Sequence, residues 1–267
     1  MSSRERIRAI ISGRAADRCG WWLGNPHHDT WPIYHSYFGT DTEEGLHVRL
    51  GSDLRWICPQ FFPSNYQPPD GRPLFGLPET KTSHGQAGPL ADCETVAEVE
   101  RHPWPNPAHL NFDECLAALR SAGYYYRASG MWTCFYHNIM DLFGMEQYMM
   151  KMYTHPAVVH AVTDRVCSFY YEANERFFAL AGDLVDGFFF GNDFGTQRGL
   201  ICGPKQFDEF ILPWFQRFTD QAHRYGYQVI LHSCGSICSC RNAHLIPSPC
   251  WMVSCVCSGG WRTDELG

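Results

Sequence analysis

The sequence predicts an α/β fold with parallel strands, built either as a barrel or as an open sheet. Short apolar runs alternate along the chain with longer segments whose apolar residues recur at intervals of three and four. The length of 267 residues fits one large domain. A hydrophobic fraction of 45% and a charged fraction of 18% are ordinary for a globular protein and argue against global disorder.

Five short runs predict the strands. The run at 19–23 ends at a Gly-Asn-Pro turn, and the run at 54–58 is broken by Pro59. The run at 124–131 is dense in aromatic residues, which favour strands. The five predicted strands are residues 19–23, 54–58, 124–131, 185–190 and 227–231.

The segments between these runs predict helices. The strongest starts at Pro156, which suits the first turn of a helix, and ends at Gly182 with an apolar stripe between them. The last one is interrupted at Pro213. The predicted helices are residues 5–13, 42–50, 95–100, 111–122, 145–153, 156–181 and 204–225, and the Pro- and Gly-rich stretch 59–90 predicts a long loop.

Charge and hydropathy exclude several classes of protein. A net charge of −7 with a pI near 6.0 gives no overall attraction to nucleic acid or to an anionic membrane surface. No apolar run approaches the roughly 18–20 residues that span a bilayer. The charged N-terminus lacks the apolar core of a secretory signal. We therefore expect a soluble cytoplasmic protein that acts on a small-molecule substrate, with no nucleic-acid or membrane partner.

The distribution of cysteines changes toward the C-terminus. There are 13, an odd number without secretory context, so a disulfide framework is not expected. The spacings in the tail do not match the usual zinc-binding pairs, and residues 237–267 show no helical or strand period. We expect a domain over 1–236 and an aberrant Cys-rich tail over 237–267, from a truncated or frame-shifted reading. Six cysteines fall in the last stretch: Cys234, Cys238, Cys240, Cys250, Cys255 and Cys257.

The segment around His232 and Cys234 carries the clearest chemistry. Alternate residues of a strand face the same way, so this imidazole and this thiol project together. They follow a predicted strand at its C-terminal end, where barrels and open sheets place their active sites. The pair could supply two ligands of a zinc site, although a third would be needed. The alternative is a buried strand end with an inert thiol and a hydrogen-bonded histidine.

This stretch, Leu231-His232-Ser233-Cys234-Gly235-Ser236, resembles the zinc-ligand strand of the corrinoid-linked methyltransferases in the uroporphyrinogen decarboxylase (URO-D) superfamily. Upstream, Gly191-Asn192-Asp193-Phe194-Gly195-Thr196-Gln197 resembles a strand–loop–helix connection of that superfamily. The resemblance covers roughly residues 1–236. Further similar stretches are residues 38–53, 89–105 and 186–187, with Pro204.

The resemblance implies a TIM-type (β/α)8 barrel, here a partial one that lacks its last strands. It implies that His232 and Cys234 bind Zn²⁺, which would activate a thiol acceptor for a methyl group carried on the corrinoid of a partner protein. The family's third ligand is a cysteine near the C-terminus, and no residue here can be matched to it. The zinc site is therefore incomplete as far as the resemblance defines it.

Two other functions stay open. The first is uroporphyrinogen decarboxylation, a step of porphyrin biosynthesis, which uses arginines for substrate carboxylates and no metal. The arginine-rich first-strand motif of that enzyme is missing at residues 20–30, where the sequence is Gly-Trp-Trp-Leu-Gly-Asn-Pro-His-His-Asp-Thr. The second is an inactive fragment, because a barrel that lacks strands leaves an open edge.

Five further residues are candidates for substrate contact. His27, His28 and Asp29 follow the first predicted strand and could bind substrate at the barrel mouth, or lie on a solvent-exposed loop. Asp193 and Gln197 follow the 185–190 strand and are catalytic candidates through hydrogen bonds to substrate, or serve in turns and caps.

Overall fold

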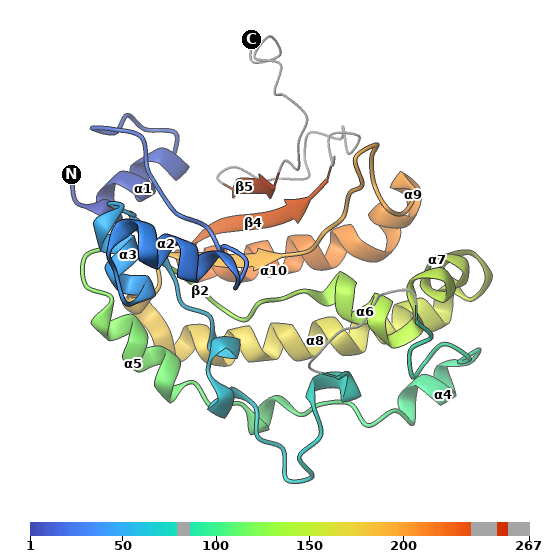
Figure 1. Cartoon of the computed structure of the whole chain (residues 1–267). Coiled ribbons are helices and arrows are strands. Elements are labelled where there is room, and N and C mark those ends of the chain that lie inside the picture. Colours follow the sequence, from blue (N-terminus) through green and yellow to red (C-terminus); the bar gives the residue numbers. More distant parts are fainter. Residues whose placement is uncertain (79–85, 236–249, 256–267) are drawn as a thin grey trace.

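The protein has an α/β fold built on one parallel sheet. The computed structural model describes residues 1–78, 86–235 and 250–255 (Figure 1). The sheet contains five strands in the order in which they occur along the chain, and every neighbouring pair is parallel. The strands are β1 (Leu54–Trp56), β2 (Tyr126–Ser129), β3 (Gly187–Gly191), β4 (Gln228–Cys234) and β5 (Cys250–Cys255).

This strand order decides between the two predicted architectures. A doubly wound sheet reverses its strand order at a switch point, whereas a barrel adds each new strand beside the previous one. The order β1-β2-β3-β4-β5 has no reversal. The described part of the chain is therefore a partial barrel of the TIM type, as the sequence predicts.

The helices confirm most of the predicted segments. A 3-10 and turn-rich connection occupies the predicted loop after residue 58. The sequence did not predict α2 or α6. The helices are α1 (Ser3–Ile11), α2 (Thr30–Phe38), α3 (Glu43–Arg49), α4 (Val96–Glu100), α5 (Asp113–Ser121), α6 (Phe135–Phe143), α7 (Met145–Thr154), α8 (Pro156–Ala181), α9 (Pro204–Gln206) and α10 (Leu212–Arg224).

The predicted interruption at Pro213 has a clear form. The segment Phe207–Ile211 is a π-helix, and α10 begins directly after it. Proline has no backbone N–H and its ring displaces the carbonyl four residues earlier, so the regular ladder cannot pass through it. The wider turns before Pro213 accommodate this break.

The outer face of the sheet packs against helices. Phe188 and Phe190 point to this side, with their rings stacked at a centroid distance of 4.7 Å. Val229 and Leu231 point the same way from the neighbouring strand. In Figure 1, α5, α8 and α10 lie on this side of the strands. This layer is the main core of the described chain.

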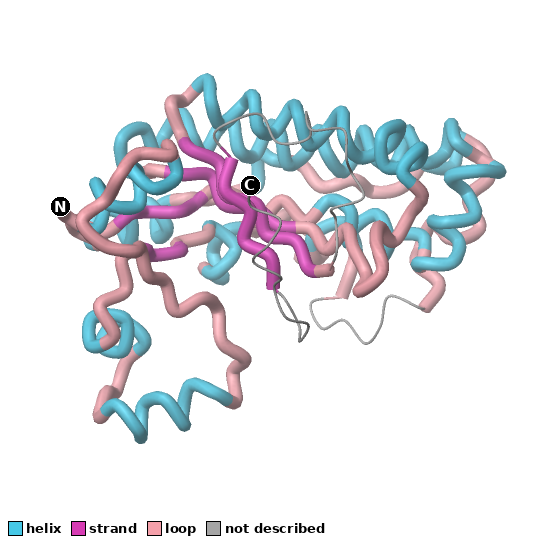
Figure 2. The backbone as a smooth tube through the Cα atoms, turned by 90° about the horizontal axis from the view of Figure 1, so that it is seen from above, coloured by secondary structure: helices cyan, strands magenta, loops and turns pink. Residues whose placement is uncertain are grey.

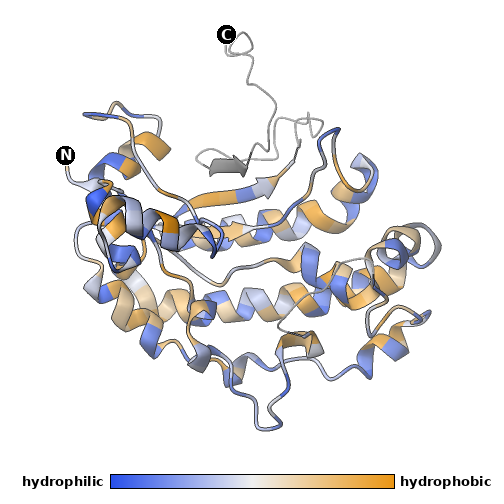
Figure 3. Ribbon diagram, in the orientation of Figure 1, coloured by the Kyte–Doolittle hydropathy of each residue, from blue (hydrophilic) through white to orange (hydrophobic). Residues whose placement is uncertain are grey.

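The inner face of the sheet carries the alternate residues of the same strands. Phe189 and Ile230 belong to a separate apolar cluster, which Ile7 and Ile11 of α1 complete. Figure 3 shows β3 as hydrophobic, whereas β4 changes from hydrophobic to hydrophilic toward its C-terminal end. Three partly buried tryptophans pack on this inner cluster: Trp22, Trp56 and Trp132.

Two elements differ from the prediction. Residues 19–23 are not a strand, because Trp21 bonds its backbone N–H to the Asp53 carboxylate and its carbonyl to the Asp53 N–H instead of joining a ladder. The fifth strand, β5, lies instead within the tail for which no regular element was expected. Residues 236–249 and 256–267 of that tail lie outside the described residues.

No helix in the described ranges has both the length and the apolar character needed to cross a membrane.

The long helix α8 offers a direct test of this layering. Phe177 is fully buried, whereas Leu180 on the same helix is 61% exposed. Phe177→Ala should cost about 3–5 kcal/mol of unfolding free energy because it removes a core side chain. Leu180→Ala should change it by less than about 0.5 kcal/mol. Denaturant unfolding of both variants measures this difference, and equal midpoints would contradict the assigned core.

Candidate metal centre

The end of β4 places an imidazole and a thiol side by side. His232 and Cys234 face the inner side of the sheet, and their Nε2 and Sγ atoms are 3.5 Å apart. Ser233 between them is fully buried on the opposite side. The alternation of side chains along a strand therefore produces the pair, and both residues remain partly accessible.

The chain that follows β3 runs alongside the end of β4. The backbone N–H of Asn192 donates to the carbonyl of His232 at 3.0 Å, and the N–H of Gly195 donates to the carbonyl of Cys234 at 3.3 Å. Between these contacts the N–H of Phe194 donates to the Ser233 hydroxyl at 3.2 Å. These bonds fix residues 192–195 in register with the two candidate ligands.

Asp193 lies in this aligned segment and joins the pair. Its Oδ1 atom accepts a hydrogen bond from the backbone N–H of Cys234 at 3.0 Å and lies 3.4 Å from Nε2 of His232. The carboxylate therefore adds an oxygen donor to the nitrogen and the sulfur.

The neighbouring Asn192 anchors the segment that carries Asp193. Its side chain is fully buried, accepts the N–H of Tyr136 at 2.9 Å and donates to the carbonyl of Thr133 at 2.9 Å. Both partners lie in or next to α6. The position of Asp193 is thus fixed from two sides, by β4 and by α6.

The charge of Asp193 is stabilised by its surroundings. Its pKa lies well below the usual aspartate value, because the His232 ring and the N–H of Cys234 bond the carboxylate, which outweighs the opposing effect of partial burial. The second carboxylate oxygen, Oδ2, lies 3.7 Å from Nε2 of His137 on α6. Asp193 is therefore a carboxylate near neutral pH, as a metal ligand must be.

The three donors fit a metal ion. The ligand atoms of Asp193, His232 and Cys234 all lie within 4.8 Å of one another. In a tetrahedral zinc site, bond lengths of about 2.0–2.3 Å separate neighbouring ligand atoms by about 3.3–3.6 Å. The observed separations of 3.5 and 3.4 Å from His232 Nε2 match these edges. Three protein ligands with a fourth position for a substrate atom are the pattern of catalytic zinc sites.

An aromatic wall borders this cluster. The ring of Trp132 lies 6.1 Å from that of His232, between centroids, and 5.4 Å from that of Phe189. Gln60 holds the backbone of Trp132 in both directions, accepting its N–H at 2.6 Å and donating to its carbonyl at 3.3 Å. A Cβ atom at Gly191 would overlap the Trp132 ring, so only glycine permits this packing.

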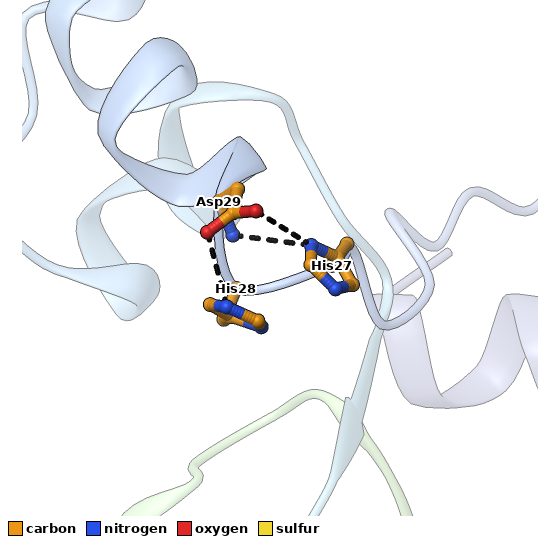
Figure 4. A group of neighbouring side chains, drawn as sticks. All are labelled: His27, His28 and Asp29. Carbon is orange, nitrogen blue, oxygen red and sulfur yellow. Dashed lines mark hydrogen bonds and ion pairs between the residues drawn. The ribbon is translucent and has the colours of Figure 1, made fainter.

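The other predicted site residues lie elsewhere. His27, His28 and Asp29 are exposed on the loop before α2, where they contact one another (Figure 4). Gln197 is exposed on the turn between Gly195 and Leu200. Of the candidates, the structure brings together Asp193, His232 and Cys234.

Two features of this cluster were not predicted. Asp193 was expected to contact substrate, and its position beside His232 and Cys234 depends on the pairing of β3 with β4, which spacing in the sequence does not reveal. His137 was not singled out, because a single histidine in a helix carries no positional signal. The signals for Asp193 were its place just after a predicted strand and the family resemblance of residues 191–197.

Comparisons with known proteins agree with this architecture. Residues 128–248 match the family model described as uroporphyrinogen decarboxylase (URO-D). This segment of the chain is similar to the URO-D family. The matched segment includes the end of β2, the strands β3 and β4, and all three residues of the cluster.

A solved structure shares the fold. It is a methyltransferase from Methanosarcina mazei, with a TM-score of 0.54 and 14% sequence identity over 89% of this chain and 71% of that one. At this identity the match shows a common fold. The search of curated proteins found no match.

The lowered pKa of Asp193 predicts how pH changes stability. An aspartate titrates near 3.9 when unfolded, so Asp193 stabilises the fold above pH of about 4, and this contribution is lost as the pH falls below it. The gap between the urea midpoints of wild type and Asp193→Asn should therefore be constant from pH 7 to about pH 5 and should narrow as the pH falls below about 4. The exposed Asp220→Asn is the control and should follow the wild type at every pH. A gap for Asp193→Asn that stays constant down to about pH 3 would contradict this.

Proposed function

We propose that the protein is a zinc-dependent methyltransferase that moves a methyl group from a corrinoid to a thiol. The observation that supports this is the cluster of Asp193, His232 and Cys234, whose donor atoms have the separations of a tetrahedral site. The methyl donor would be held by a corrinoid protein as partner, and the acceptor would be a small thiol. The place of action would be the cytoplasm.

Each residue has a defined task in this proposal. His232, Cys234 and Asp193 would hold Zn²⁺ and leave one position open toward the inner face. Bound there, zinc lowers the pKa of a thiol ligand, so that a thiolate is available at neutral pH. His137, near the outer oxygen of Asp193, would keep the carboxylate turned toward the ion, as partners of metal ligands commonly do.

The aromatic wall would position the reactants and exclude water. Trp132 is fixed by Gln60 and packs between His232 and the inner tryptophan cluster. Edge-to-face packing of these rings makes a rigid apolar surface next to the donors. In such surroundings a thiolate has fewer water molecules to displace before it attacks the methyl carbon.

The alternative, decarboxylation of a porphyrinogen, needs arginines directed at substrate carboxylates. The buried arginines of the described chain are engaged elsewhere. Arg6 pairs with Asp53 at 2.7 Å, and Arg127 contacts Asp186 at 3.4 Å. Both carboxylates precede strands and so lie at the opposite end of the sheet from His232. The third buried arginine, Arg55, pairs with Glu44.

Metal binding by the full-length chain tests the first half of the proposal. Cobalt(II) added to the metal-free protein should give the absorption of a thiolate-bound cobalt site. Cys234→Ala should abolish that band, and Asp193→Asn should weaken binding by at least about tenfold. Cys19→Ala, which removes an exposed cysteine, should change neither. A band that survives Cys234→Ala would show that another thiol binds the metal.

Methyl transfer itself tests the second half. The zinc-loaded protein should demethylate methylcobalamin in the presence of a thiol, and the rate should fall at least about 100-fold for Cys234→Ala. Trp132→Ala should lower the rate while one zinc stays bound, since the wall positions reactants and holds no ligand. Zinc binding without transfer to any thiol tested would support an inactive barrel fragment.

A further inference from the structure

A second group of metal-binding side chains lies outside this cluster. His27, His28 and Asp29 lie on the loop before α2, and their donor atoms fall within 4.8 Å of one another. All three side chains are exposed (Figure 4). We propose that these residues form a surface site for a divalent transition metal such as Zn²⁺, Ni²⁺ or Cu²⁺. Neither the proposed methyl transfer nor the family match assigns such a site.

The orientation of Asp29 is the first argument. Asp29 directly precedes α2, and its backbone is already helical (φ −68°, ψ −16°), so its side chain is not placed to accept a hydrogen bond from the first N–H groups of the helix. Its side chain makes no such bond. Instead, Oδ1 lies 3.0 Å from Nε2 of His28 and Oδ2 lies 3.4 Å from Nδ1 of His27. The carboxylate thus faces two imidazoles in place of the helix end.

The separations are the second argument. Ligand atoms around a four-coordinate ion bound through nitrogen and oxygen at about 2.0–2.2 Å lie about 3.3–3.5 Å apart, and the two oxygens of one carboxylate come closer. The 3.4 Å separation of His27 Nδ1 and Asp29 Oδ2 agrees with a shared ion. The 3.0 Å separation of His28 Nε2 and Asp29 Oδ1 is that of a hydrogen bond, and His27 Nδ1 also accepts the backbone N–H of Asp29 at 3.4 Å, so an ion would replace these two contacts. The rings themselves are 4.0 Å apart between centroids and tilted by 40°.

The loop is already arranged for such an ion. The N–H of Thr30 donates to the carbonyl of His27 at 2.8 Å, and this bond closes a backbone turn that contains the three residues. A ligand set within one short turn needs little additional ordering when the ion binds. The partial positive charge at the N-terminus of α2 disfavours a cation here, and the negative charge of Asp29 offsets this repulsion.

The donor set selects the class of ion. Two imidazoles and a carboxylate suit zinc, nickel and copper, whereas magnesium and calcium prefer oxygen ligands throughout. The side chains of His27, His28 and Asp29 are 66%, 82% and 78% exposed. The remaining coordination positions therefore face solvent, so we expect a weaker site than the inner one, with room for an external ligand.

The two metal sites are structurally independent. No residue of α2 is buried, and α2 makes its contacts chiefly with α3. In Figure 1, α2 and α3 lie in front of the sheet, and Figure 2 shows this helical excursion reaching away from the strands. Substitutions at the exposed loop should therefore leave the fold and the inner cluster unchanged.

Copper(II) binding to the full-length chain tests the site. The wild type should bind one more ion than the His27→Ala/His28→Ala double variant, measured by calorimetric titration. The electron paramagnetic resonance spectrum of the lost ion should show nitrogen couplings from imidazole. His160→Ala is the matched control, because His160 is exposed beside one carboxylate, Glu209, at 3.4 Å. This control should retain the ion and its nitrogen couplings.

The outcomes separate this site from the proposed function. Loss of one ion in the double variant, with Cys234→Ala still binding an ion at the loop, supports the surface site even if methyl transfer fails. Asp29→Asn should weaken the loop site at least tenfold. Equal stoichiometry and affinity for wild type and double variant would overturn the proposal, as would an equal loss in His160→Ala.

Discussion

The alignment of residues 192–195 with the end of β4 determines the whole candidate metal centre. A parallel sheet brings the C-terminal ends of neighbouring strands to one edge, but side chains meet there only if the chains continue in register beyond the strands. Here three backbone N–H groups after β3 bond to His232, Ser233 and Cys234. Without these bonds, Asp193 would not be held beside the end of β4. The imidazole and the thiol would then lack a third donor.

Side chains alternate along these strands, so that the residues that pack against the helices lie on one face and the candidate metal ligands lie on the other. Phe188 and Phe190 face the helical layer, and Phe189 faces the inner cluster. Along β4, Ile230 continues the inner face, and His232 and Cys234 follow it at intervals of two. The inner face thus changes from apolar to polar while the chain remains a strand. Two of the three donors therefore belong to a strand, and the cluster does not depend on a loop alone.

The sequence predicts the fold better than the site, for a physical reason. Periodicity and end signals locate α8 and the π-helical break before Pro213, because both depend on neighbouring residues. The spacing of His232 and Cys234 likewise predicts their common face. The third donor and the failure of residues 19–23 to form a strand depend on contacts across the fold, with β4 and with Asp53 respectively. Such contacts leave no local pattern.

The two ends of the sheet carry opposite electrostatic roles, and this favours metal chemistry over recognition by arginine. Asp53 and Asp186 are fully buried and directly precede strands β1 and β3. Each forms ion pairs with at least two arginines. Removing one partner of such a buried network leaves an uncompensated charge, so these arginines are held in place. At the other end Asp193 instead faces imidazoles and a thiol. Asp193 has no arginine contact in the described residues, so this end of the sheet supports the proposed zinc site and not the recognition of substrate carboxylates by arginine.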